Sequence, residues 1–244
     1  MERRRRQSWQ GREVACSQVP ADGGVDWTRR RVIGAALSMV GLALAGSTSL
    51  ALASHIMRTP PQTRGPFYPL QLPLDKDNDL VTVAGRSGLA KGEITHVVGR
   101  VLDEHGRPVP KARIEVWQCD ANGRYRHPGD RGGAPPDPNF QGYGEFITGV
   151  AGTYRFRTIK PVPYSGRAPH IHFAIGGPGV KPLVTQLYVE GAPENQRDSP
   201  LNSLPDLDAR RRLIVPFESD AALRSGELIA RFDVVLAIDG ASGS

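Results

Sequence analysis

Cysteine is almost absent from this sequence, which has two in 244 residues, Cys16 and Cys119. This scarcity excludes the cysteine-rich zinc sites and the disulfide frameworks that stabilise many small exported domains. A domain of this composition depends on its apolar core, or on a metal held by other residues. Cys119 itself is expected to be a small buried hydrophobic residue rather than a reactive thiol.

A strong excess of either charge is also missing once the N-terminal segment is set aside. The whole chain has 31 Lys and Arg against 25 Asp and Glu, but residues 1–53 hold 8 of the basic and 4 of the acidic residues. The remainder has 23 basic and 21 acidic side chains, so it lacks the basic excess typical of nucleic-acid-binding proteins. No nucleic-acid partner is expected.

Long apolar runs are missing too, with one exception at residues 32–52. This run is diluted by glycine, follows the pair Arg29 and Arg30, and ends in the small-x-small cleavage pattern Ala-Leu-Ala at Ala53. These features predict a twin-arginine export signal over residues 1–53, and therefore a periplasmic or secreted protein without a stable membrane anchor. The alternative is a retained transmembrane anchor, because the run is roughly long enough to span a bilayer.

Proline and glycine, in contrast, are plentiful, at 21 and 28 residues, and they separate short apolar segments. Residues 54–92 are irregular and rich in proline, which predicts an extended arm lying across the domain. Residues 93–244 then contain the strand-like segments THVVGRVL, ARIEVW, GTYRFRTI, HIHFAIG, LVTQLYVEG and ELIARFDVVLAI. This pattern predicts an all-β domain over residues 93–244, an antiparallel β-sandwich or barrel with long loops. Little helix is expected beyond a short one in LPDLDARRRLI.

The stretch YSGRAPHIHFAI has two histidines separated by one residue, His170 and His172. In a strand, residues i and i+2 point to the same side, so the two imidazoles would lie in parallel. A bare His-x-His pair is as often a packed or exposed pair as a metal site. Two tyrosines change this balance: Tyr164 lies six residues before His170, and Tyr125 follows an earlier strand. Two imidazoles and two phenols suit ferric iron better than zinc or copper(I).

The sequence resembles the intradiol ring-cleavage dioxygenases, and most closely the protocatechuate 3,4-dioxygenase type. The resemblance rests on VVGRVLDEHGRPVPKARIEVWQCDANGRYRH, DPNFQGYGEFITGVAGTYRFRTIKPVPY, GRAPHIHF, TQLYVEG, RFDVVL and the arm segment TRGPFYP. It covers roughly residues 65–236, nearly the whole predicted mature chain. It implies an oxidoreductase that cleaves catechol-type 1,2-diols with O2 between the two hydroxyl-bearing carbons, giving cis,cis-muconate-type diacids.

The resemblance also implies a non-haem Fe(III) cofactor and its protein ligands. By position, Tyr125 and His170 would be the equatorial ligands, and Tyr164 and His172 the axial ones. Tyr164 would leave the metal and take a substrate proton when the diol binds.

Three further residues match positions near the substrate in the family. Arg167, three residues before His170, matches an arginine whose positive charge would stabilise the anionic catecholate. Gln186 matches a glutamine behind the ligands, although a polar position on a strand explains it equally well. Tyr68 matches an arm tyrosine near the pocket, and core packing is the alternative for it.

One segment departs from the family pattern. The protocatechuate enzymes have a longer, tryptophan-bearing segment between the axial tyrosine and the first histidine, whereas this chain has the short SGRAP. One wall of the pocket is therefore missing or supplied elsewhere. This departure predicts a more open site that accepts varied catechols or hydroxyquinols.

Two other interpretations stay open from the sequence. VVGRVLDEHGRPVPKARIEVW by itself also resembles transthyretin-like and carboxypeptidase-regulatory-like modules, which are β-sandwiches that bind no metal. A copper or zinc site built on the His-x-His pair is the other. The sequence leaves the substrate and the oligomeric state undetermined, and a homo-oligomer is compatible with it.

Overall fold

The computed structural model describes residues 56–239. The predicted export signal, residues 1–53, lies outside the described residues. Within residues 56–239, no helix is long and apolar enough to cross a membrane.

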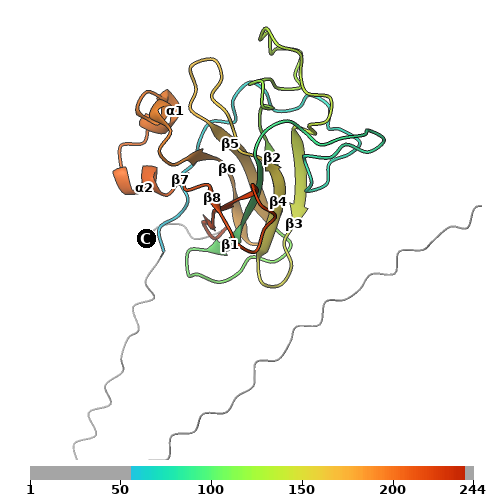
Figure 1. Ribbon diagram of the computed structural model, residues 1–244. Coiled ribbons are helices and arrows are strands. Elements are labelled where there is room, and N and C mark those ends of the chain that lie inside the picture. Colours follow the sequence, from blue (N-terminus) through green and yellow to red (C-terminus); the bar gives the residue numbers. More distant parts are fainter. Residues whose placement is uncertain (1–55, 240–244) are drawn as a thin grey trace, which may run out of the picture. The chain divides into compact units, whose positions relative to one another are not determined.

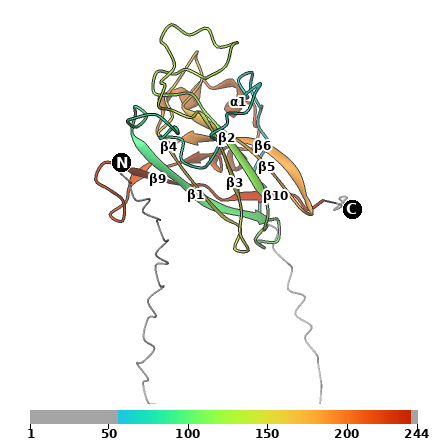
Figure 2. The ribbon, with the colours of Figure 1, turned by 90° about the vertical axis from the view of Figure 1, so that its right-hand side faces the viewer.

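The first of two five-stranded sheets is built around the long strand β1 (Figure 2). β1 pairs antiparallel with β4 along seven residues, and parallel with β9 and then β10 on its other edge. β8 completes the sheet beside β9. The strands are β1 (Ile94–Asp103), β4 (Thr153–Ile159), β8 (Glu218–Ser219), β9 (Leu228–Arg231) and β10 (Val234–Leu236).

The second sheet carries the histidine pair and has the order β3-β2-β5-β6-β7 (Figure 1). Its first four strands pair antiparallel, and β7 pairs parallel with β6. The strands are β2 (Arg113–Trp117), β3 (Tyr143–Ile147), β5 (His170–Gly177), β6 (Val180–Val189) and β7 (Ile214–Val215).

The main core contains the inward side chains of both sheets, among them Val97, Phe156, Ile171 and Phe173, all almost fully buried. Because side chains alternate along a strand, this inward row on β5 turns His170 and His172 to the opposite face. The all-β fold with long loops is confirmed. The sheets are mixed, however, because β7, β9 and β10 each join a neighbour in parallel.

Helices are few and short, and they follow β6 in the chain: η1 (Pro193–Gln196), α1 (Ser199–Asn202) and α2 (Leu207–Arg211). The helix expected in LPDLDARRRLI is confirmed as α2. Asp198 caps the N-terminus of α1 by accepting from the Leu201 amide, and Asp206 caps α2 by accepting from the Asp208 amide.

The arm before β1 lies against both sheets. The Thr59 amide donates to the Val235 carbonyl of β10 at 3.0 Å, and the Gln62 amide donates to the Val184 carbonyl of β6 at 2.8 Å. Farther along, Gly65 has a φ of +68°, and a Cβ there would lie 3.2 Å from Cε1 of His172. The arm thus covers the face of the second sheet on which the histidines lie.

Candidate metal centre and substrate site

The two histidines lie on the same face of β5, as their spacing predicts. Each has 1 % of its surface exposed, and their Nε2 atoms are 3.1 Å apart. His170 donates from Nδ1 to the Ala168 carbonyl at 2.6 Å, which fixes the tautomer and leaves a lone pair on Nε2. Trp117 of β2 stacks on the His172 ring, with centroids 4.8 Å apart and planes 2° from parallel.

Tyr125 reaches the histidines from the loop after β2. That loop turns tightly because Asp120 accepts the Asn122 and Arg124 amides on Oδ1, at 2.8 and 3.0 Å. The Tyr125 amide then donates to Asp130 Oδ2 at 2.7 Å. Short-range carboxylate contacts therefore hold the backbone on both sides of this residue.

Tyr164 is the first of the four residues of a tight turn. Ser165 and Gly166 have φ values of 43° and 77°, and the Arg167 amide donates to the Tyr164 carbonyl at 2.8 Å. Two left-handed central residues closed by this bond are typical of a type I′ turn. The short SGRAP segment thereby brings Tyr164 and Arg167 opposite one another.

The four candidate ligands converge in one buried cluster. The Tyr125 ring centroid lies 5.1 Å from that of Tyr164 and 6.3 Å from that of His172, and Tyr164 lies 5.5 Å from His170. In residues 56–239, no group of three or more His, Cys, Asp or Glu side chains is placed to hold a metal. The phenols of Tyr125 and Tyr164 add two oxygen donors to the histidine pair.

Electrostatics at the cluster favour the neutral forms of all four groups. Burial raises the pKa of Tyr125 well above its usual value, and burial likewise raises the pKa of Tyr164. The Tyr125 hydroxyl is buried and makes no hydrogen bond of ordinary length and angle; its one polar neighbour of this kind is the Tyr164 phenol, a weak contact that also raises the Tyr125 pKa. A buried hydroxyl without a partner is costly, and coordination to a cation would both ionise it and satisfy it. The donor set therefore fits a Lewis-acidic metal such as Fe(III).

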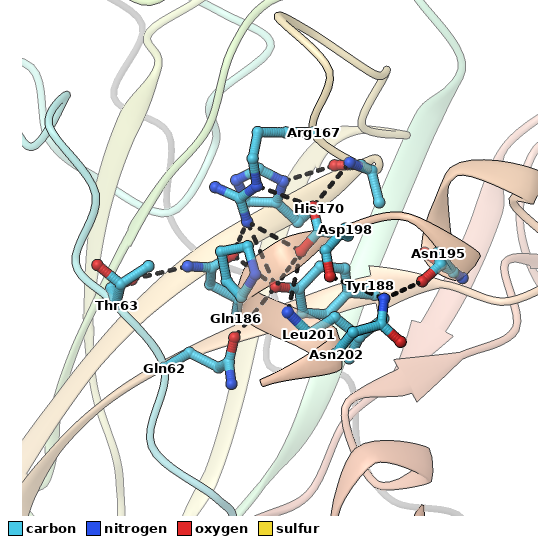
Figure 3. A network of polar contacts seen from close by, with 12 residues as sticks. Gln62, Thr63, Arg167, His170, Gln186, Tyr188, Asn195, Asp198, Leu201 and Asn202 are labelled. Carbon is cyan, nitrogen blue, oxygen red and sulfur yellow. Dashed lines mark hydrogen bonds and ion pairs between the residues drawn. The ribbon is translucent and has the colours of Figure 1, made fainter. Parts of the chain in front are cut away.

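Arg167 lies beside the cluster, held by a network of polar side chains (Figure 3). Its Nε donates to Asp198 Oδ2 at 2.8 Å, and its Nη2 donates to Gln186 Oε1 at 2.7 Å. Gln186 is fully buried, and its Nε2 donates to the Thr63 carbonyl of the arm at 2.7 Å. Gln186 thus links the arginine to the arm, directly across from His172 in the sheet.

Tyr68 lies near the cluster and is connected to it through Trp117. Its ring meets Trp117 edge-on at 5.0 Å, its hydroxyl donates to Glu115 Oε2 at 2.8 Å, and the Arg64 guanidinium lies 3.7 Å above it. The ring supports Trp117, which in turn stacks on His172. A role in substrate binding stays a prediction for Tyr68.

Three residues of the site were missed by the sequence analysis: Trp117, Tyr188 and Asp198. Trp117 shares one face of β2 with Arg113 and Glu115, and nothing in its own segment of the sequence connects it to His172. Tyr188 is paired with His170 across β5 and β6 and donates to Gln186 Oε1 at 2.9 Å. Asp198, followed by Ser-Pro, carries an N-cap signal, but nothing in its neighbourhood in the sequence connects it to Arg167.

Comparison with known proteins decides the family. A sequence profile described as "Dioxygenase" matches residues 63–238, which contain every candidate site residue. The chain belongs to the intradiol ring-cleavage dioxygenases. The beta chain of protocatechuate 3,4-dioxygenase from Burkholderia cepacia is 43% identical over 169 residues, covering 66% of this chain and 71% of that one. Hydroxyquinol 1,2-dioxygenase from Corynebacterium glutamicum is 34% identical over 148 residues, covering 53% of this chain and 46% of its own.

Solved structures agree with this dioxygenase assignment. The dioxygenase domain of a dioxygenase carbohydrate-binding protein fusion from Streptomyces sp. SirexAA-E has a TM-score of 0.56 and 29% identity, covering 75% of this chain and 99% of that one. The resemblance drawn from the motifs is therefore confirmed, and the protein is an oxidoreductase of this family. The chain spans about half the length of the hydroxyquinol relative from Corynebacterium.

The buried histidines of this dioxygenase predict an acid-sensitive iron-free form. Burial, followed by the charge of Arg167, lowers the pKa of His170 to about 4, and burial lowers the pKa of His172 well below its usual value. Below an unfolded value of about 6.5, the unfolded chain binds protons that the folded chain excludes, so stability falls as pH decreases from 6.5 toward 4. We expect a loss of about 3 kcal/mol from His170 by pH 4.

Urea unfolding of iron-free protein between pH 7.5 and 4.5 measures this loss. A His170→Gln variant should show a flatter dependence over the same range. A free energy of unfolding that stays constant between pH 7 and pH 5 would contradict the prediction.

Proposed function

We propose that this chain is an exported, non-haem Fe(III) intradiol dioxygenase that cleaves catechol-type 1,2-diols between the two hydroxyl-bearing carbons. Both atoms of O2 enter the product, a cis,cis-muconate-type diacid. The observation that carries the proposal is the convergence of two neutral imidazoles and two phenols in one buried cluster beside a fixed arginine. The similarity to protocatechuate, hydroxyquinol and catechol dioxygenases supports it.

Tyr125, Tyr164, His170 and His172 would hold the iron. When bound, Fe(III) supplies the Lewis acidity that ionises the phenols and the diol and makes the diolate ring reactive toward O2. The hydrogen bond from His170 Nδ1 to Ala168 keeps the Nε2 lone pair available. Stacking on Trp117 fixes the plane of the His172 ring.

Proton transfer on substrate binding falls to Tyr164. It is only partly buried, whereas Tyr125 is enclosed, so Tyr164 is the phenol with room to move. Burial raises its pKa, so Tyr164 would favour its protonated form whenever it does not ligate a metal, as a residue that accepts a diol proton must.

Arg167 supplies a permanent positive charge for the diolate. Its side chain is 17% exposed, and its planar fork is fixed on one edge by Asp198 and Gln186. A preorganised charge of this kind stabilises negative charge that develops on the ring without reorganising during the reaction.

The substrate range is proposed to be broad. Only Ser165 and Gly166 separate Tyr164 from Arg167, and apart from Arg167 the SGRAP segment carries no large side chain that could close that side of the pocket. Varied catechols and hydroxyquinols are therefore the proposed substrates. Turnover restricted to protocatechuate would contradict this part of the proposal.

Export through the twin-arginine route is proposed from the leader alone. That route carries folded proteins, which suits a chain whose cofactor is enclosed by an arm and loops. N-terminal sequencing of the exported protein should give a chain that begins at Ser54. A full-length chain confined to the cytoplasm would refute export.

Colour and oxygen uptake test the central proposal. Iron-loaded protein should be burgundy, from phenolate-to-iron charge transfer, and should consume one O2 for each catechol while the muconate absorbance rises. Extradiol cleavage would give a different, yellow product. A protein that stays colourless after iron reconstitution and cleaves no diol would instead support a metal-free binding module, and a blue one a copper site.

A further inference from the structure

The Asp198 carboxylate is the most completely enclosed acidic group around the site. It is 0% exposed and lies in the short connection between η1 and α1. Its Oδ2 accepts from Arg167 Nε at 2.8 Å and from the Ala168 amide at 2.9 Å. Its Oδ1 accepts from the Leu201 amide at 3.0 Å and lies 3.3 Å from the Tyr188 hydroxyl. Three polar groups at the site and one helix end therefore share a single carboxylate (Figure 3).

The contact with Arg167 fixes the direction of the guanidinium. Nε is held by Asp198 and Nη2 by Gln186, while none of the hydrogen bonds among residues 56–239 uses Nη1. The Nε and Nη2 edge of the guanidinium is bonded to the protein, so the N–H groups of Nη1 are available to a bound anion. Without Asp198, a flexible arginine side chain would adopt several rotamers at this position.

The contact with Ala168 reaches the metal ligands. The Ala168 amide donates to Asp198, and the Ala168 carbonyl accepts from His170 Nδ1 at 2.6 Å. The two peptide groups on either side of the Ala168 Cα are thus held by Asp198 and His170. This short path joins the carboxylate to the group that sets the His170 tautomer.

We propose that Asp198 is a positioning residue of this site. Its carboxylate orients the Arg167 guanidinium toward the bound diolate and, through Ala168, keeps His170 in the tautomer that presents Nε2. The inference rests on the proposed function, and it adds a residue that acts through Arg167 and His170 without touching the substrate.

A simple helix cap does not account for this arrangement. Asp206 caps α2 in the same way, through the Asp208 amide at 2.9 Å, and it is exposed and makes no contact with the site. Asp198 is buried and pairs with a guanidinium in addition to its cap. Burial acts to raise the pKa of Asp198, but hydrogen bonds from Arg167, Leu201 and Ala168 hold it below the usual value, so the group stays anionic.

A double-mutant cycle between Asp198 and Arg167 tests the proposal on full-length, iron-loaded protein. Asp198→Asn should lower kcat/KM for catechol by about 30- to 100-fold, and Arg167→Gln by about 100- to 1000-fold. In the Arg167→Gln background, Asp198→Asn should add less than about a threefold loss, because the group it orients is already absent. Asp206→Asn is the matched control, and it should keep wild-type kcat/KM.

A second readout does not depend on turnover. In iron-free protein, ¹⁵N NMR should show slowly exchanging Arg167 Nε–H and His170 Nδ1–H protons. Asp198→Asn should speed exchange of both by at least about tenfold, and Asp206→Asn should leave both unchanged. Should Asp198→Asn not fold, Asp198→Glu keeps the charge but displaces the guanidinium, and it should show the same loss of kcat/KM.

The outcomes separate the inference from the proposed function. Losses that multiply in the double variant, or a folded Asp198 variant with wild-type kcat/KM, would overturn the positioning role. If wild-type protein binds iron but cleaves no diol, the proposed function fails. The proton-exchange comparison then still decides whether Asp198 holds Arg167 and His170.

Discussion

Tyr125→Phe should abolish ring cleavage and at the same time leave the iron-free protein at least as stable as the wild type. The activity should fall because one of the two phenols that would hold the ferric ion is lost, so the metal would be bound less tightly and in an altered ligand set. The expected loss is at least about 10³-fold in kcat, since the lost contribution is several kcal/mol. The charge-transfer absorbance should weaken and shift in parallel.

The opposite effect on stability follows from the buried Tyr125 hydroxyl. It is enclosed with no hydrogen bond of ordinary geometry and only a weak contact to the Tyr164 phenol, so its removal should stabilise the iron-free fold by up to about 1 kcal/mol. Tyr154→Phe is the matched control, because the equally buried Tyr154 hydroxyl donates to the Phe232 carbonyl. That variant should lose stability by about 1 kcal/mol and keep its activity.

Urea unfolding of the iron-free proteins and oxygen uptake of the loaded ones measure both effects. Retained activity in Tyr125→Phe would remove Tyr125 from the ligand set. An iron-free Tyr125→Phe protein as destabilised as Tyr154→Phe would show that the hydroxyl is satisfied without metal.

The parts of the site that the sequence predicted are those fixed by short-range geometry. His170 and His172 share a face because strand periodicity is local, and Tyr164 lies near them because six residues and one turn separate it from His170. Tyr125 and Gln186 come from other segments, and only the resemblance to a family placed them together with the histidines. The structure brings Tyr125 to the cluster and places Gln186 opposite His172.

The parts that the sequence did not predict depend on long-range packing. Asp198 meets Arg167 across 31 residues, from the connection between η1 and α1 that follows β6. The parallel pairings of β9 and β10 with β1 have the same origin, since alternation identifies a strand but not the direction of its neighbour. The sandwich itself was predictable because apolar and polar side chains alternate along the strands, and this alternation shows which face of each strand points to the core.

Gly65→Ala should reduce activity far more than its backbone penalty alone explains. Gly65 has a φ of +68°, where alanine is strained, and a new Cβ would lie 3.2 Å from His172 Cε1. Gly85 has a φ of +78° with open space around it, so Gly85→Ala carries the strain without the contact. Both variants should lose about 1 kcal/mol of stability.

Only Gly65→Ala should also lose activity, by about 10-fold, because His172 or the arm must shift by a few tenths of an ångström, and a full 1 Å misplacement at a reacting group costs about 100-fold. The added methyl must push either the His172 ring or the arm, and the arm is bonded to Gln186 through the Thr63 carbonyl. Thermal unfolding and kcat/KM for catechol, measured on both variants, separate strain from contact. Equal losses of activity in the two would mean that the arm's backbone conformation, rather than its approach to His172, governs the site.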